Sequence, residues 1–275
     1  MLEIPECKNL VKQIKSTLIN KKIIEVIVAN NPHKFAFFYD DIATYKKQLL
    51  NKRITDCRCF GGQLEIIIED KSLLLSEGIN LRYQTKEKAL PKKHQLFIGF
   101  DDESCLFLTI SMYGFIGVFD TGTYDNQYYT IACSKPDIES VAFDETYFLD
   151  LLATQDEKTS IKAALATKQS IPGLGNGILQ DILFNAKINP KTKLDKIDLT
   201  MRKELFKALK DTVNEMIQKG GRDIESDLFG VSGLYQTKMS SKTLTTPCSL
   251  CHNTIIKEAY LGGNVYYCPV CQPKI

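Results

Sequence analysis

Two closely spaced cysteine pairs near the C-terminal end limit what that part of the chain can fold into. Cys248 and Cys251 form the first pair, Cys268 and Cys271 form the second, and sixteen residues separate the pairs. Four thiolates with this spacing can surround one zinc ion as a tetrahedron, and a bound metal supplies folding energy to so short a segment. We therefore predict one structural Zn²⁺ held by these four cysteines. Two redox dithiols are the alternative interpretation.

The other five of the nine cysteines are scattered along the chain and lie mostly among apolar neighbours, which predicts buried free thiols. No stretch approaches the length of about 18 consecutive apolar residues that a membrane helix needs. The acidic first residues do not resemble a secretory signal, which begins with a basic region followed by an apolar run. We expect a monomer in the cytoplasm, without membrane contact and with its thiols reduced.

The spacing of apolar residues changes along the chain from one helix to strands and then to helices. An apolar stripe at helical spacing predicts a first helix over residues 6–20. Runs rich in β-branched residues predict strands over residues 22–29, 63–69, 72–76, 95–100, 106–111 and 117–119. Further helices are predicted over residues 145–152, 159–166, 176–186 and 199–219, the last ending at Gly220-Gly221.

These elements predict an α+β protein in three parts. Residues 1–134 would form an N-terminal β-sandwich domain with an N-terminal helix. Residues 135–240 would form a helical domain, and the boundary before it is marked by Pro136 and an acidic stretch. Residues 241–275 would form a zinc finger, in which Leu261-Gly262-Gly263-Asn264-Val265 provides the turn of a hairpin.

The formal charge of +2 hides an uneven distribution. Residues 1–134 carry 17 basic and 16 acidic side chains, whereas residues 158–219 carry 12 basic and 6 acidic ones. A local basic surface matters more for binding a polyanion than the total charge does. A solvated helix face is the alternative explanation for the same excess.

The segment Lys168–Ile178 contains Pro172-Gly173-Leu174-Gly175-Asn176 between two predicted helices, an arrangement typical of a helix–two-turn–helix. Gly175 allows close backbone approach, and Asn176 is a suitable N-cap residue. Free N–H groups at the helix start would then hold a phosphate, with Lys162 and Lys168 as neighbouring contacts. A turn that only connects two helices is the alternative.

A second short segment, Asn30-Asn31-Pro32-His33-Lys34-Phe35, contains one of only three histidines in the chain. His33 and Lys34 are candidates for a replacement catalytic site or for phosphate contacts. The simpler interpretation is a surface turn that begins at Asn31-Pro32.

Through these motifs together, the chain resembles the formamidopyrimidine-DNA glycosylase and endonuclease VIII family of base-excision-repair enzymes. The resemblance spans essentially the whole chain. It includes Met1-x-Glu3-x-Pro5-Glu6 at the start, Pro172–Asn176, Ile188-Asn189-Pro190, and the four zinc-ligand cysteines. The resemblance implies a β-sandwich joined to a helix–two-turn–helix domain with a zinc finger, and double-stranded DNA with a lesion or abasic site in the cleft between them.

Family chemistry uses the amine of a proline at position 2, which attacks C1′ of the damaged nucleotide, and the resulting Schiff base allows strand cleavage by elimination. By the same resemblance, Glu3 would handle protons at the sugar and Glu6 would order the site. Position 2 here is Leu2, so the free amine would belong to Met1. An α-amine has a pKa of about 8 and is partly neutral near pH 7, which keeps Met1 as a candidate nucleophile.

Five further family positions differ. The second catalytic lysine aligns with Gly62, and the phosphate-binding arginine of the zinc finger is replaced near Gly263. The three side chains that fill the void in damaged DNA align with Glu77, Met112 and Tyr113. A carboxylate at position 77 would repel phosphates, whereas Met112 and Tyr113 can wedge into a base stack.

The sequence therefore predicts a protein that binds damaged DNA and has impaired Schiff-base lyase chemistry. The first alternative is an active glycosylase that uses Glu3 with water, or the Met1 amine. The second alternative, from another class, is a zinc-ribbon interaction module without DNA binding. Whether the chain is an enzyme stays open at this stage.

Overall fold

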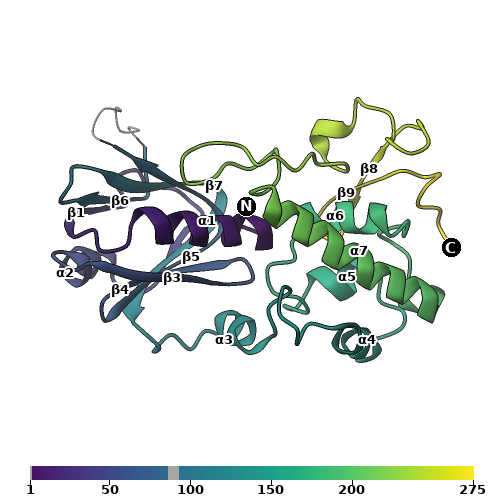
Figure 1. Cartoon of the computed structure of the whole chain (residues 1–275), viewed down its shortest axis with the longest axis horizontal. Helices are drawn as coiled ribbons and strands as arrows, with labels where there is room; N and C mark the ends of the chain where they lie inside the picture. Colours follow the sequence, from purple (N-terminus) through teal and green to yellow (C-terminus); the bar gives the residue numbers. More distant parts are fainter. Residues whose placement is uncertain (1, 86–92) are drawn as a thin grey trace.

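Helix α1 (Ile4–Thr17) lies beside the sheet of the N-terminal half of the molecule, with its N-terminal end at the junction with the C-terminal half, and contributes to the cores of both (Figure 1). The computed structural model describes residues 2–85 and 93–275. Leu10 and Ile14 are buried in the N-terminal core, whereas Ile4 is buried in the C-terminal core. Pro5 stands in the first turn, where a missing backbone N–H costs nothing. One face of α1 thus fixes how the two halves sit together.

The N-terminal half contains a seven-stranded sheet with strand order β1-β6-β7-β5-β4-β3, and β2 pairs with β7 in parallel. The strands are β1 (Ile23–Val28), β2 (Ala36–Phe38), β3 (Ile54–Phe60), β4 (Gln63–Ile68), β5 (Lys71–Gln84), β6 (Leu96–Phe100) and β7 (Cys105–Asp120). Two short helices, η1 (Ile42–Thr44) and α2 (Tyr45–Leu49), follow β2.

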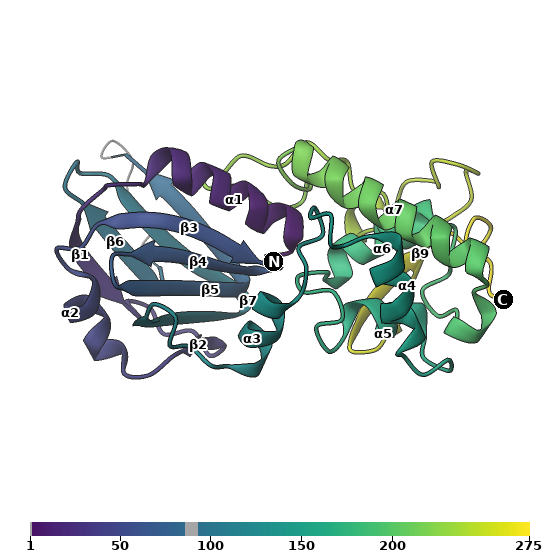
Figure 2. The same cartoon turned by 60° about the horizontal axis from the view of Figure 1, so that its bottom comes forward.

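Strands β5 and β7 pair over almost their whole length and carry the sheet from one layer to the other. The first part of β5, Lys71–Ser76, pairs with β4, while the start of β7 pairs with β6. A bulge between Glu77 and Ile79 separates the two parts, and bulges bend strands. The sheet therefore covers the apolar core from two sides, in agreement with the predicted β-sandwich (Figure 2).

The C-terminal half is helical, as predicted. It contains α4 (Glu145–Ala153), α5 (Ile161–Ala166), α6 (Asn176–Asn185), η2 (Leu194–Lys196) and α7 (Leu199–Gln218), and α3 (Gln127–Ser134) lies between the halves. Asp144, Ser160 and Asp198 cap three of these helices by accepting a backbone N–H. Within the described residues, no helix is both long and apolar enough to cross a membrane.

The C-terminal hairpin forms where the sequence predicts it. Its strands are β8 (Ile256–Tyr260) and β9 (Gly263–Tyr267), joined by Leu261-Gly262 and preceded by η3 (Ser241–Thr243). The Tyr266 amide donates to Oε1 of Gln180, which ties β9 to α6. The hairpin thus packs against the helix that follows the Pro172–Asn176 turn.

A segment without regular structure, residues 222–237, returns from the end of α7 to the N-terminal half, and we call it the strap. Leu228 on the strap is fully buried in the N-terminal core. Its carbonyl accepts the Tyr83 amide at 2.8 Å, and its own amide donates to Oε1 of Gln13 at 3.0 Å. Arg82 donates to the Asp227 carbonyl at 3.0 Å. The strap is therefore a second connection between the halves, besides α1.

Candidate functional site

A cleft of about 510 Å³ opens where the two halves meet. Leu2 and Glu3 lie in it, at the N-terminal end of α1. One wall carries aromatic side chains that follow or belong to β7, and the other wall is the turn that leads into α6. The lining residues of these walls include Tyr113, Phe115, Tyr124, Tyr128, Gln169, Gly173, Gly175 and Asn176. The cleft thus joins residues from the start, middle and second half of the chain.

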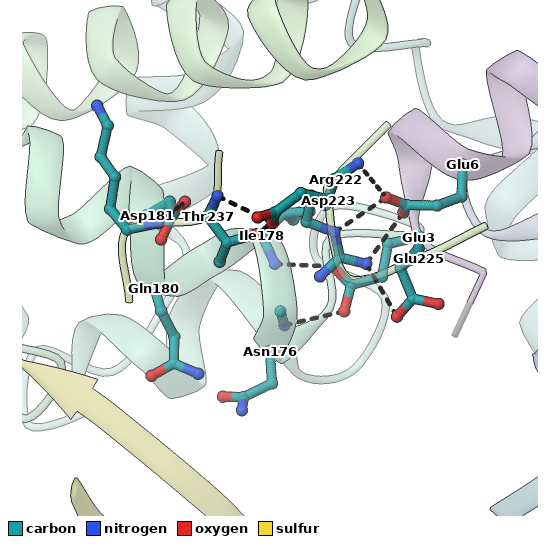
Figure 3. Close-up of polar contacts among 12 residues, drawn as sticks. Glu3, Glu6, Asn176, Ile178, Gln180, Asp181, Arg222, Asp223, Glu225 and Thr237 are labelled. Atoms are coloured by element: carbon teal, nitrogen blue, oxygen red, sulfur yellow. Dashed lines mark hydrogen bonds and ion pairs between the residues drawn. The ribbon is translucent and has the colours of Figure 1, made fainter. Parts of the chain in front are cut away.

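Glu3 caps α6 across the junction between the halves. Its Oε1 accepts the Gly177 amide at 2.9 Å, and its Oε2 accepts the Ile178 amide at 2.7 Å (Figure 3). A negative charge at this end of a helix is also favoured by the helix dipole. The N-cap residue is Gly175, so the predicted N-cap role of Asn176 is wrong by one position. Two N–H groups expected to hold a phosphate are instead occupied by Glu3.

A single buried guanidinium, that of Arg222, joins Glu3 to Glu6. Nε and Nη2 of Arg222 donate to the two Glu6 oxygens at 2.9 and 3.0 Å, and Nη1 lies 3.4 Å from Oε2 of Glu3 (Figure 3). Glu225 lies 3.7 Å from Nη2. The Arg222 side chain is only 2% exposed. Both predicted acidic residues are therefore brought together by a residue that the sequence analysis did not single out.

The charges in this cluster do not balance, because one guanidinium faces three carboxylates. Burial raises the pKa of Glu3 above its ordinary value of 4.5, Arg222 opposes this rise, and the nearby charge of Glu6 adds to it. A carboxyl with a raised pKa that lines a cleft is a candidate for handling protons.

Glycines make room for this cluster. An added Cβ at Gly175 would lie 2.3 Å from Oε1 of Glu3, and one at Gly177 would lie 1.9 Å from Nη1 of Arg222. Any side chain at either position would displace the buried carboxylate or guanidinium. The glycines of the predicted helix–two-turn–helix therefore make room for the side chains of Glu3 and Arg222.

The position that aligns with the family's second lysine lies in the tight turn between β3 and β4. An added Cβ at Gly62 would lie 2.5 Å from the Leu2 carbonyl oxygen, and one at Gly61 would lie 2.3 Å from the Pro172 carbonyl carbon. Gly173, at φ +75°, would in turn meet the Gly62 nitrogen at 2.2 Å. Backbone packs directly on backbone here, which leaves no space for a lysine side chain at position 62.

The start of the chain is fixed in the cleft by its backbone. The Leu2 amide donates to the Glu77 carbonyl at 2.7 Å, and the Ile4 amide donates to the Gly173 carbonyl at 3.1 Å. The Leu2 side chain is 7% exposed and packs into the N-terminal core. The predicted nucleophile Met1 lies outside the described residues.

Lys162 and Asn176, both predicted to bind phosphate, meet at the tip of the hairpin. Lys162 donates to the Tyr260 carbonyl at 2.7 Å, and Asn176 donates to the Asn264 carbonyl at 2.9 Å. An added Cβ at Gly263 would lie 3.8 Å from Nδ2 of Asn176 and 3.9 Å from Nζ of Lys162. Burial lowers the pKa of Lys162. The three positions thus form one cluster, in which Lys162 and Asn176 bond to the hairpin backbone.

The other predicted DNA contacts are spread over both halves. Lys168 is exposed in the turn after α5, and Met112 and Tyr113 are exposed on β7 beside the cleft. Lys34 is exposed in the turn before β2, and Nδ1 of His33 accepts the Phe35 amide at 3.3 Å. His33 and Lys34 are not among the residues that line the cleft.

The four predicted metal ligands converge at the base of the hairpin. All four Sγ atoms lie within 4.8 Å of one another, with Cys248 to Cys271 at 3.8 Å and Cys251 to Cys268 at 3.3 Å. Zinc–sulfur bonds of about 2.3 Å in a tetrahedron place sulfur atoms about 3.8 Å apart. This donor set fits one metal ion.

Comparison with known proteins agrees with this geometry. Residues 135–227 match the family model described as the formamidopyrimidine-DNA glycosylase H2TH domain, that is, the helix–two-turn–helix domain. A formamidopyrimidine-DNA glycosylase of Cytobacillus firmus is 27% identical over 99% of this chain and all of that protein. One from Shouchella clausii is also 27% identical, over the full length of both.

Solved structures share the fold. The structure of Lactococcus lactis Fpg in complex with DNA containing an abasic site superimposes with a TM-score of 0.84 at 22% identity, over 99% of this chain and all of that one. The MutM (Fpg) protein from Thermus thermophilus gives a TM-score of 0.80 at 18% identity, over 99% of each chain.

Proposed function

We propose that this chain binds damaged double-stranded DNA in its cleft and that its Schiff-base lyase chemistry is impaired. The chain belongs to the formamidopyrimidine-DNA glycosylase and endonuclease VIII family of DNA-repair glycosylases. Relatives with this fold have been solved with DNA that contains an abasic site, as in Lactococcus lactis Fpg. This likeness supports DNA as the ligand of this chain.

The observation that carries the loss of lyase chemistry is the backbone contact at Gly62. The turn between β3 and β4 packs so closely on Leu2 that no side chain fits there, and so no lysine amine can stand at this position. The nitrogen at position 2 is an amide that donates to Glu77, not a free proline amine. Both family amines are thus missing from their usual positions.

The cluster at the hairpin tip supports the binding part of the proposal. Asn176 and Lys162 bond to the hairpin and form one surface with it beside the cleft, and Lys168 is exposed at the preceding turn. We propose that this surface and Lys168 lie against the DNA backbone, while Met112 and Tyr113 approach the bases from the opposite wall.

The raised pKa of Glu3 favours a second candidate function, a glycosylase that releases a base by hydrolysis without an amine nucleophile. Glu3 lines the cleft, and its raised pKa brings proton exchange closer to neutral pH. In this mechanism the carboxylate accepts a proton from the water that attacks C1′, the bond between C1′ and the base breaks, and the proton passes from Glu3 to the departing base. Arg222 and the α6 amides keep the carboxylate in place, and Glu6 holds Arg222. A free Met1 amine would be the other route to activity.

A binding titration tests the primary proposal. Fluorescence anisotropy with a duplex that carries a tetrahydrofuran abasic-site analogue, repeated over a range of salt, should show binding that weakens steeply as salt rises. An undamaged duplex of the same sequence is the control and should bind more weakly. No binding at low salt would refute the proposal that the chain binds DNA and would favour the alternative of a zinc-ribbon interaction module.

Two activity assays separate the candidates. Borohydride should trap no covalent adduct on natural abasic DNA, and an adduct that disappears when Met1 is chemically blocked would establish an amine lyase. Base release from a panel of oxidised duplexes tests the hydrolytic route. Release by the native chain that persists unchanged in Glu3→Gln would argue against Glu3 as the proton-handling group.

We further propose that the metal at the four cysteines is a structural Zn²⁺, and that the chain divides into residues 1–134, 135–240 and 241–275. Zinc is favoured because four thiolates in a closed tetrahedral site are its usual structural ligands. Cys248→Ser should lower the zinc content measured by elemental analysis and weaken DNA binding, whereas Cys133→Ser, at an exposed thiol, should change neither. Full zinc content in Cys248→Ser would refute the ligand assignment.

A further inference from the structure

Strand β2 presents aromatic side chains to solvent on one of its two faces. Side chains alternate along a strand, and Ala36 and Phe38 point toward the N-terminal core. Phe37 therefore points outward and is 53% exposed, and Phe35, just before the strand, is 47% exposed. Large apolar rings on the outer face of a short edge strand contribute little to folding.

The neighbouring strand continues this face. Phe37 lies directly opposite Phe115 in the parallel pairing of β2 with β7, and Tyr113 lies two residues before Phe115 on the same face. Tyr113 and Phe115 also line the cleft, together with Tyr128 at the start of α3. We call Phe35, Phe37, Tyr113, Phe115 and Tyr128 the aromatic strip.

The strip runs from the cleft to the outside of the N-terminal half. Its inner members share the cleft with Asn176 and Gly175, which belong to the wall that we propose lies against the DNA backbone. Its outer end carries a positive charge, because Nζ of Lys34 lies 5.3 Å from the centre of the Phe35 ring. The described residues that line the cleft include no lysine or arginine. The aromatic wall of the cleft therefore suits bases better than phosphates.

We propose that the aromatic strip stacks unpaired DNA bases next to the damaged nucleotide, so that the chain prefers lesions in locally unpaired DNA to lesions in a fully paired duplex. Aromatic rings bind unpaired bases through their flat faces whatever the sequence, and Lys34 would contact a phosphate at the outer end. This inference rests on the proposed function, because it takes the cleft to be the DNA site.

The test compares two DNAs that differ only in pairing. One is a fully paired duplex with a tetrahydrofuran site, and the other has the same strand opposite a mismatched stretch, so that the bases beside the site are unpaired. The native chain should bind the unpaired form more tightly in anisotropy titrations. Phe35→Ala/Phe37→Ala should weaken binding of the unpaired form about tenfold or more, and binding of the paired form less than about twofold.

Two additional readouts identify stacking. A 2-aminopurine placed in the unpaired stretch should lose fluorescence on binding to the native chain and keep it with the alanine variant. The salt dependence of the affinity should have the same slope in both, because the rings carry no charge. Phe35→Leu/Phe37→Leu preserves apolar surface without a ring, so it should behave like the alanine variant if stacking is responsible.

Leu199→Ala is the matched control, since Leu199 is 60% exposed on the first turn of α7, away from the strip, and should bind both DNAs like the native chain. Melting followed by circular dichroism should show that every variant folds. If the native chain binds neither DNA, the proposed function fails. If it binds both equally, or if the leucine variant keeps the preference, the stacking inference alone is overturned.

Discussion

One arginine side chain holds the acidic residues of this site in place. Arg222 is almost fully buried, and its neighbours are the carboxylates of Glu3, Glu6 and Glu225. Burying an ion is costly, and the cost is offset only while the partners are present and hydrogen-bonded. The backbone amide of Arg222 also donates to Glu6 at 3.3 Å, which adds a contact that depends on the fold of the strap. The site is therefore sensitive to this single residue.

Replacing Arg222 with methionine is expected to lower the free energy of unfolding by about 3–5 kcal/mol at neutral pH, because it leaves the buried Glu3 and Glu6 carboxylates without the guanidinium that balances their charge. The loss of unfolding free energy should be smaller at about pH 4.5, because burial raises the pKa of Glu3 above that value and protonation of this carboxyl removes uncompensated charge. Urea unfolding at both values measures this. Arg53→Met, at a half-exposed arginine 3.9 Å from Asp101, should cost less than about 1 kcal/mol. Equal losses in the two variants would contradict the central role of Arg222.

The raised pKa of Glu3 predicts a particular dependence of stability on pH. In the unfolded chain this carboxyl ionises near its ordinary pKa of 4.5, whereas in the folded protein its pKa is higher because of burial. The folded state therefore holds the proton more tightly, so the contribution of Glu3 to stability is largest below pH 4.5 and is lost as the pH rises through the folded pKa.

The difference in unfolding free energy between the native chain and Glu3→Gln isolates this contribution. That difference should fall with rising pH above about 4.5. Denaturant titrations at several pH values give the curve. A difference that rises over this window would mean that the helix start and Arg222 lower the pKa of Glu3, contrary to the direction argued here.

Sequence alone reveals the residues of this site to very different degrees. The convergence of the four cysteines was predicted because it is encoded in local spacing, and the four sulfurs do lie together. Glu3 and Glu6 were found through the family resemblance. Arg222 was missed because nothing local distinguishes it, since its partner Glu6 stands 216 residues away in the chain. A basic residue directly after Gly220-Gly221 was the one available signal.

At the scale of elements, the site depends on the meeting of one turn and one helix start. The Gly61-Gly62 turn packs on Pro172-Gly173 with no side chain between the two backbones, and Glu3 closes the N-terminal end of α6. The same close packing excludes a lysine at position 62. The close backbone packing of the cleft floor and the lack of space for a side chain at position 62 therefore have one structural cause.

Gly173→Ala is expected to lower the free energy of unfolding for two reasons. The left-handed backbone at this position costs about 1 kcal/mol with any side chain, and the added Cβ would displace the Gly62 backbone at a further cost of about 1–3 kcal/mol. Gly262→Ala is a matched control, because Gly262 has φ +73° beside 75° for Gly173 and nothing within 4 Å of an added Cβ. Thermal unfolding of both variants measures the difference. Equal shifts in the two would mean that the turn contact is loose.

Most elements with strong patterns were predicted, whereas the strands β2 and β3 and the helices α2 and α3 were not. The helices of the C-terminal half and the hairpin follow their apolar spacing and caps. Strand β2 was missed because it has three residues and is held by its parallel pairing with β7, which no local pattern encodes. Two predicted strands form the single long strand β7, whose interior contains Gly114 where a break was expected.

At the scale of the whole molecule, the chain crosses between its halves more than once. Helix α1 starts in the C-terminal core and continues in the N-terminal core, and the strap returns from α7 to bury Leu228 beside the sheet. Gln13 on α1 donates to Asp227 at 2.7 Å and accepts the Leu228 amide, so the two connections also contact each other. The geometry of the cleft between the halves follows from these crossings.

Leu228→Ala tests whether the strap fixes the two halves together. Removing a fully buried leucine side chain should cost about 2–5 kcal/mol of unfolding free energy, and the loss should fall on the contact between the halves. Amide hydrogen exchange should therefore speed up at Tyr83, whose amide donates to the Leu228 carbonyl, while α6 and α7 keep their protection. Affinity for abasic DNA should fall as well, because both walls of the cleft must be held to bind one ligand.

Leu234→Ala is the control on the same strap, since Leu234 is 72% exposed and its loss should change stability by less than about 0.5 kcal/mol. A Leu228→Ala protein with native exchange at Tyr83 and native DNA affinity would show that the Leu228 side chain is not needed to hold the halves together. In that case α1 and the backbone contacts of the strap would be sufficient for this role, because the Tyr83 amide would still be bonded to the strap. The two outcomes therefore distinguish the buried side chain of Leu228 from the backbone contacts of the strap as the source of the connection.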